Sequence, residues 1–106
     1  MKKLTLLLAY SCFALTAFSQ QNADTLQQTG RDYMRKGDWG NAIMVFNRAR
    51  QQKPNDISLR NDIAYTYFLQ RDFAKALETI KPVVESNEAD VQSFQIAGTV
   101  YRAIEE

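Results

Sequence analysis

Five acidic side chains in the second half of the sequence are the first candidates for acid–base chemistry. They are Asp62, Asp72, Glu78, Glu85 and Glu88. A catalytic pair needs two groups held together in a shielded pocket, and these residues share no spacing that would bring two of them together. The sequence also lacks histidine, a glycine-rich phosphate loop and a serine beside a candidate base. We therefore expect neither enzymatic activity nor a bound cofactor.

Metal and thiol chemistry is restricted to a single cysteine, Cys12. Without a second cysteine or any histidine, the chain has no internal disulfide and no Cys/His zinc site beyond its N-terminus. The formal charge is +1, from 13 basic and 12 acidic residues, and removal of Lys2 and Lys3 would leave 11 against 12, or −1. This near-neutrality gives no electrostatic reason to expect nucleic acid or an anionic membrane as a partner.

The first 19 residues have the layout of a secretory signal peptide. Met1–Lys3 is basic, residues 4–18 are largely apolar, and Ala17–Ser19 places small residues where a signal peptidase reads them. We expect cleavage between Ser19 and Gln20 and export to the periplasm or the cell exterior. The apolar run is shorter than the roughly 18 residues of a spanning helix, so no stable membrane insertion is expected after cleavage.

Two alternatives to a cleaved signal stay open. The N-terminal segment is an uncleaved anchor in one, and Cys12 is a lipid attachment site in the other. The second alternative is disfavoured because the apolar run continues beyond the cysteine and the preceding Ala9-Tyr10-Ser11 fits poorly.

The rest of the chain, residues 20–106, repeats itself at an interval of 34 residues. Two sets of three positions show the interval: Tyr33, Tyr67 and Tyr101, and Gly30, Ala64 and Gly98. A period of about 34 residues is typical of stacked helix-turn-helix units. The length of 106 residues allows one small domain, and 24% charged with 45% hydrophobic residues is a globular composition.

The first repeat predicts two helices joined by a tight turn. Apolar residues recur at spacings of three and four over residues 26–34 and again over 39–49, and each set defines one helical face. Gly37 suits the left-handed conformation that ends a helix, and Asp38 suits the cap of the next. Gly30 costs about 1 kcal/mol inside a helix relative to alanine, so we expect a neighbouring helix to approach closely there.

The later repeats vary this pattern in three places. Arg71 replaces Gly37, which predicts a strained or differently closed turn. Pro82 falls late in the fourth helix, where it predicts a kink or an early end. Asp90 is placed to cap a fifth helix, and the sequence stops at Glu106 before a partner for that helix.

These residues resemble the tetratricopeptide repeat family, whose units carry Trp-Leu-Gly-Tyr in the first helix and Ala-Phe-Ala-Pro in the second. In the first repeat, Leu26 and Thr29 replace the Trp and Leu. Six positions match at the family's spacing: Gly30, Tyr33, Ala42, Phe46, Ala49 and Pro54. The resemblance implies an all-α fold of antiparallel helix-turn-helix repeats, stacked as a short right-handed α-solenoid. The units would be about two and a half in number, at residues 23–56, 57–90 and, in part, 91–106.

The resemblance also implies a concave groove, lined by the first helix of each unit, that holds a protein or peptide partner. The residues expected to line it are Gln27, Arg31, Met34, Arg35, Asn61, Asp62, Tyr65, Phe68, Leu69, Gln92, Gln95 and Thr99. Arg31 and Arg35 lie one helical turn apart and could take carboxylates. Tyr65 and Phe68 could supply an apolar anchor. In the alternative, the arginines are ordinary surface charges and the two aromatic rings pack locally.

Some members of the family clamp the C-terminal carboxylates of chaperones with Lys and Asn. Asp62 stands at one of those positions and would repel a carboxylate, so we do not expect that role. Two functions remain. One is an exported, non-enzymatic adaptor or scaffold that binds a protein or peptide in the groove. The other is a structural module that forms homo-oligomers through its incomplete C-terminal repeat.

The last helix distinguishes these two functions. It either caps the array with a polar outer face or docks its apolar face on another chain, and the sequence favours the cap. The polar residues expected on that face are Gln92, Ser93, Gln95, Arg102 and Glu105. The aromatic residues of the packing stripe are expected in the core: Tyr33, Trp39, Phe46, Tyr67, Phe73 and Tyr101.

Overall fold

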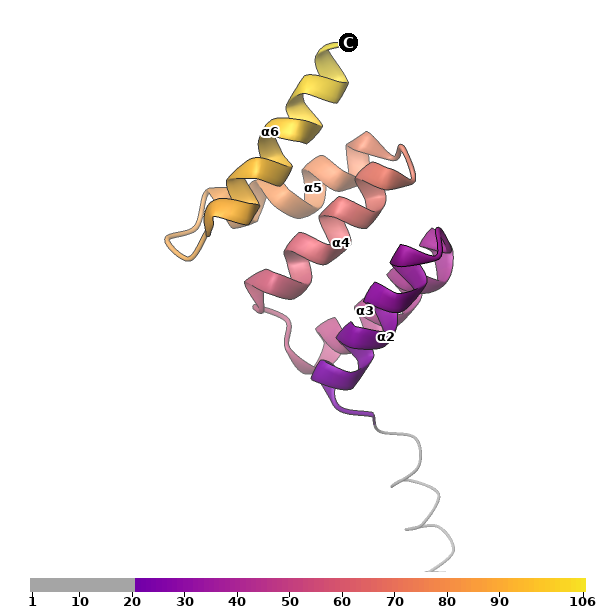
Figure 1. The fold of residues 1–106 in the computed structure, drawn as a ribbon. Coiled ribbons are helices and arrows are strands. Elements are labelled where there is room, and N and C mark those ends of the chain that lie inside the picture. The colour runs from indigo at the N-terminus through magenta and orange to yellow at the C-terminus, as the bar shows by residue number, and fades with distance from the viewer. Residues whose placement is uncertain (1–20) are drawn as a thin grey trace, which may run out of the picture.

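The computed structural model describes residues 21–106, and the predicted signal peptide lies outside this part. The described residues form an all-α fold. Its helices are α2 (Ala23–Arg35), α3 (Trp39–Gln52), α4 (Ile57–Leu69), α5 (Phe73–Val84) and α6 (Val91–Glu105). Consecutive helices run antiparallel and pack on one another (Figure 1). The predicted fold class and the two and a half helical repeats are confirmed.

Each helix begins at a polar side chain that caps its first turn. The Oδ1 atom of Asn22 accepts a hydrogen bond from the backbone N–H of Thr25 at 2.8 Å, and Asp56 accepts one from Leu59 at 2.9 Å. The remaining caps are Asp38, Asp72 and Asp90. The first N–H groups of a helix have no partner within it, and these side chains supply one. The caps therefore fix where each helix starts.

The turns inside the first and second repeats have the same backbone geometry. Gly37 has φ +76° and Arg71, at the equivalent position, has φ +66°. In each turn the next residue donates a hydrogen bond of 2.9 Å to a tyrosine carbonyl, that of Tyr33 or Tyr67. Since L side chains are disfavoured in the left-handed region, the strain predicted at Arg71 is confirmed.

Pro82 lies in the last turn of α5, two residues before its end. The helix has 12 residues, whereas its counterpart α3 has 14. Proline has no N–H to donate to the carbonyl four residues earlier, so the end of the helix follows soon after it. Of the two outcomes predicted for Pro82, the structure shows the early end.

The helices stack in two layers. α2, α4 and α6 lie side by side in chain order, and α3 and α5 pack behind them (Figure 1). Two apolar clusters fill the space between the layers. The largest buried side chains of the first cluster are Phe46, Leu59 and Ile63, and those of the second are Ile80, Val83 and Val100. Neither repeat buries its apolar face alone, and stacking produces the continuous core.

The close approach predicted at Gly30 is confirmed. The ring of Phe46 packs directly on its Cα, and a Cβ atom built there would overlap the ring. At the equivalent position in the third repeat, a Cβ on Gly98 would meet no atom within 4 Å. The same residue type is therefore required by packing in the first repeat and unconstrained by it in the third.

Two predictions for α6 are wrong. Tyr101 is exposed instead of lying in the core, because no second helix covers that side of α6 among residues 21–106. Ser93 is fully buried instead of contributing to a polar outer face, because its Oγ lies 2.9 Å from Oδ1 of Asn61 on α4. None of the helices in the described part has the length and apolarity needed to cross a membrane.

Candidate partner-binding face

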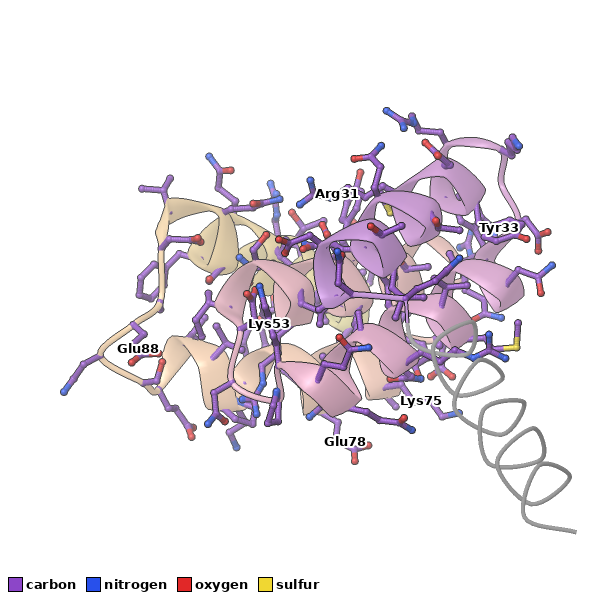
Figure 2. All side chains as sticks on the ribbon, turned by 90° about the horizontal axis from the view of Figure 1, so that it is seen from below. Arg31, Tyr33, Lys53, Lys75, Glu78 and Glu88 are labelled. Carbon is purple, nitrogen blue, oxygen red and sulfur yellow. The ribbon has the colours of Figure 1, made fainter. Side chains whose placement is uncertain are left out.

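The face that the sequence predicts as a binding groove is formed by α2, α4 and α6, on the side away from α3 and α5. We call it the inner face. Figure 2 shows Arg31 of α2 on this side of the stack and Lys75 and Glu78 of α5 on the opposite side. The two halves of the inner face, between α2 and α4 and between α4 and α6, differ in chemistry.

Internal hydrogen bonds close the α2–α4 half. Arg31 Nε and Gln27 Nε2 both donate to Oδ2 of Asp62, each at 2.8 Å. Arg31 Nη2 and Gln27 Nε2 also donate to Ser58 Oγ, at 3.2 and 3.1 Å. The Asp62 side chain is only 8% exposed, so its charge is held by these donors and not by water. Arg31 is thus engaged within the fold and not free for a ligand carboxylate.

The other candidates on α2 also make internal contacts. Arg35 forms an ion pair with Asp32 on the same helix, and both side chains remain exposed. Met34 is half-buried, and its Sδ lies 3.2 Å from Thr66 Oγ1 on α4. These contacts agree with the alternative in which the arginines are surface charges without a ligand.

Asn61 does not line the inner face. It is fully buried between α4 and α6, where its Nδ2 donates to Asp90 Oδ1 at 3.1 Å and its Oδ1 accepts from Ser93 Oγ at 2.9 Å. Its expected contact with a ligand is therefore replaced by a structural role, which is to join the N-terminus of α6 to α4. The spacing of helical faces does not distinguish a buried polar residue at the edge of a groove from an exposed one.

Hydrogen bonds at this junction shift one titration. The backbone N–H of Ser93 donates to Asp90 Oδ1 at 2.8 Å, and bonds from the Ser93 hydroxyl and Asn61 add to it. Hydrogen bonds to the ionised form favour it, so they lower the pKa of Asp90 below its ordinary value of 3.8, against a smaller opposing effect of burial.

The α4–α6 half contains an open hollow of about 300 Å³. Its lining residues are Tyr65, Gln92, Gln95, Ile96 and Thr99. Tyr65 follows Arg31 by 34 residues and Ile96 follows Asp62 by 34. The ion pair that closes the first half is therefore replaced here by two apolar side chains, and the space beside them is left unfilled.

Phe68 extends this apolar surface toward the C-terminal end of α4. Its ring stacks on that of Tyr65, with centroids 6.0 Å apart and planes 20° apart, and lies 5.7 Å from the ring of Phe73. A second hollow of about 570 Å³ adjoins it. The residues lining the second hollow are Phe68, Leu69, Arg71, Phe73, Ala103 and Glu106.

Of the predicted residues, Tyr65, Gln92, Gln95 and Thr99 come together around one hollow, and Phe68 and Leu69 line the other. The sequence analysis assigned no binding role to Ile96 or Ala103. Ile96 was detectable, because comparison with Asp62 one repeat earlier shows a charged residue replaced by an apolar one. Ala103 lies at the end of α6, and no repeated position marks it as a lining residue.

The arrangement suits binding more than catalysis. In residues 21–106, no group of three or more acidic, histidine or cysteine side chains is placed to hold a metal ion. Comparison with known families matches residues 33–95 to the tetratricopeptide repeat, and no curated protein matches the chain. The matched region covers more than half of the 106 residues and spans the turns and seams described above. The chain belongs to the tetratricopeptide repeat family, whose domains are generally protein–protein interaction modules and typically non-catalytic.

Proposed function

We propose that this domain binds an extended segment of a partner protein along the α4–α6 half of its inner face. The observation that supports this is the contrast between equivalent positions. Arg31 and Asp62 satisfy each other, whereas Tyr65 and Ile96 border an unfilled hollow. Exposed aromatic side chains in a hollow are typical anchors of protein interfaces.

The lining residues indicate the chemistry of the ligand. Tyr65 and Ile96 offer apolar surface, and the side-chain amides of Gln92 and Gln95 can each donate and accept hydrogen bonds. A peptide backbone presents the same two groups in alternation. The ligand that fits is a neutral, extended segment with an apolar side chain directed at Tyr65.

The stacked rings allow a second anchor. Phe68 separates the hollow beside Tyr65 from the one bordered by Phe73 and Ala103. An extended segment that crosses Phe68 would place one apolar side chain on each side of it. We therefore propose a ligand with two apolar residues separated by a short spacer.

Selection from a displayed library of random peptides tests this proposal without a known partner. Peptides enriched on the full chain should contain paired apolar residues. Tyr65→Ala should weaken their binding by about 2 kcal/mol, or roughly 30-fold, as expected for truncation of an interface anchor. Lys75→Ala on the opposite face is the matched control and should leave affinity unchanged. Peptides that bind Tyr65→Ala as tightly as the unaltered chain would rule out the inner face as the site.

We further propose that the protein is exported and begins, after cleavage, at Gln20. The support is the order of basic, apolar and small residues in positions 1–19. Intact mass of the protein recovered from the periplasm or culture medium tests the proposal. A mass matching residues 20–106 supports it. A retained Met1 indicates an anchor, and a mass increase at Cys12 indicates lipid attachment, and either result would contradict cleavage at Ser19.

A further inference from the structure

The outer side of α6 is an apolar helix face without a partner in the described part of the chain. Val91 is 72% exposed and Phe94 is 57% exposed, and Tyr101 is also exposed. Gly98 lies between them in sequence, with open space where its side chain would be. Positions 91, 94, 98 and 101 follow one another at spacings of three and four, so they share one side of the helix. Figure 1 shows α6 at the end of the stack.

The first repeat shows what covers such a face. Ala23 and Leu26, which precede Val91 and Phe94 by 68 residues, or two intervals, are only 5% and 7% exposed. They are buried because α3 packs on that side of α2. The face of α6 therefore has the composition of a buried seam, and it is exposed because its second helix is lacking.

The size of the central residue indicates what the missing helix carries. In the first repeat, Gly30 receives the ring of Phe46. In the second, the equivalent residues are Ala64 and Ile80, both fully buried in one cluster. A smaller residue on the first helix is thus matched by a larger one on the second. Gly98 restores the glycine, which selects an aromatic ring.

We propose that the outer face of α6 is a docking site for an amphipathic helix of the α3 type, with a phenylalanine that packs on Gly98. In α3 this phenylalanine is flanked by small residues at spacings of four and three: Ala42 and Ala49. The same small-large-small pattern defines the occupant. This inference is independent of the inner-face proposal, because the two surfaces share no residue.

A second copy of the chain fits this face less well. Two α6 helices that pair antiparallel about Gly98 would place residue 98 + n opposite residue 98 − n. Glu106 of each copy would then lie near Asp90 of the other, at both ends of the pair. Like charges in these positions are destabilising, whereas a helix of the α3 type brings no such repulsion.

A labelled synthetic peptide of residues 38–53 is the direct probe. Titrated into the full chain, it should bind saturably and shift NMR signals of α6. Gly98→Leu should weaken binding at least about tenfold, since a side chain there occupies the space of the ring. The same substitution should raise the melting temperature, because leucine favours a helix more than glycine. Weaker binding with higher stability separates lost docking from damaged folding.

Size complementarity provides the control. A peptide with Phe46→Ile should bind the unaltered chain less tightly than the natural sequence does, and the order should reverse on Gly98→Ala. Binding that depends on Tyr65 and not on Gly98 would place the peptide on the inner face and overturn the proposal. A dimer of the chain alone, dissociated by Tyr101→Glu in sedimentation, would identify a second copy as the occupant and overturn it as well.

A covalent version covers the case of a peptide too short to fold alone. Glu106 follows Asp38 by 68 residues, so residues 39–53 appended directly after it continue the repeat in register. The extended chain should melt at a higher temperature than the original. The gain should disappear when the appended helix carries alanine in place of its phenylalanine. An extended chain with an unchanged melting temperature would refute docking even when the helix is tethered.

Discussion

The ring of Phe46 occupies the space that any side chain at position 30 would need. Gly30→Ala should therefore destabilise the domain despite the helix propensity of alanine. Forcing the ring aside costs about 1–3 kcal/mol, and the propensity gain returns only about 1 kcal/mol. Unfolding in urea should give a lower free energy for the variant.

Gly98→Ala is the matched control for Gly30→Ala. The substitution is chemically the same but meets open space, so it should raise the free energy of unfolding by up to about 1 kcal/mol. Opposite signs at the two positions would show that packing, and not backbone entropy, determines the glycine in the first repeat. Equal effects at both positions would contradict the close approach of Phe46.

Arg71→Gly should stabilise the domain. Arg71 has φ +66°, in the left-handed region that costs a non-glycine residue about 1–2 kcal/mol. Glycine removes this strain but adds disorder to the unfolded chain, worth about 0.4–1 kcal/mol, so a net gain below about 1 kcal/mol is expected. The reciprocal substitution Gly37→Arg should lower stability, and thermal unfolding of the two variants checks both signs.

Asp90 should make stability depend on pH in the acid range. Its pKa in the folded protein lies below its ordinary value of 3.8, so the ionised form is favoured by folding. The resulting stabilisation is present above the unfolded pKa and is lost as the pH falls through the folded pKa. Asp90→Asn retains an N-cap without a charge, so its advantage or deficit relative to the unaltered chain should change between pH 5 and lower values.

NMR titration of the Asp90 carboxyl measures the shift directly. Its midpoint should fall below 3.8 in the folded domain, because Ser93 and Asn61 donate to the ionised form. Ser93→Ala removes one donor and should move the midpoint upward. A midpoint at or above the ordinary value would contradict the hydrogen bonds at the start of α6.

The architecture was predictable because local signals and the 34-residue period agree. Caps such as Asp56, the glycine turn at Gly37 and the face spacing each point to the same helices, and consistency of this kind makes a fold readable from its sequence. The placement of α3 against α2 followed from one small residue, Gly30. These features depend on neighbours in sequence or on a fixed repeat.

The binding face was less predictable because it depends on pairing between helices. Arg31 reads as a free cation until Asp62 is found 2.8 Å away on the next helix, 31 residues later. Asn61 reads as a groove residue until its partners on α6 are known. Which polar groups satisfy one another is decided by tertiary geometry, and helical periodicity alone does not contain it.

The ion pair between Arg31 and Asp62 should support the fold without contributing to ligand affinity. Asp62→Ala removes the acceptor shared by Arg31 and Gln27 and should destabilise the domain. A double-mutant cycle with Arg31→Ala should give a coupling energy of about 1 kcal/mol, because one partner is nearly buried and the other half-exposed.

Arg31→Ala should nevertheless bind peptides selected on the unaltered chain with unchanged affinity, provided that the measurement is made where the variant is folded. The ligand site proposed beside Tyr65 is lined by neutral side chains, so raising the salt concentration should also leave affinity nearly constant. Isothermal titration at low and high salt measures both effects. A loss of affinity in Arg31→Ala together with a steep salt dependence would mean that the ligand displaces Asp62 and takes the arginine for itself.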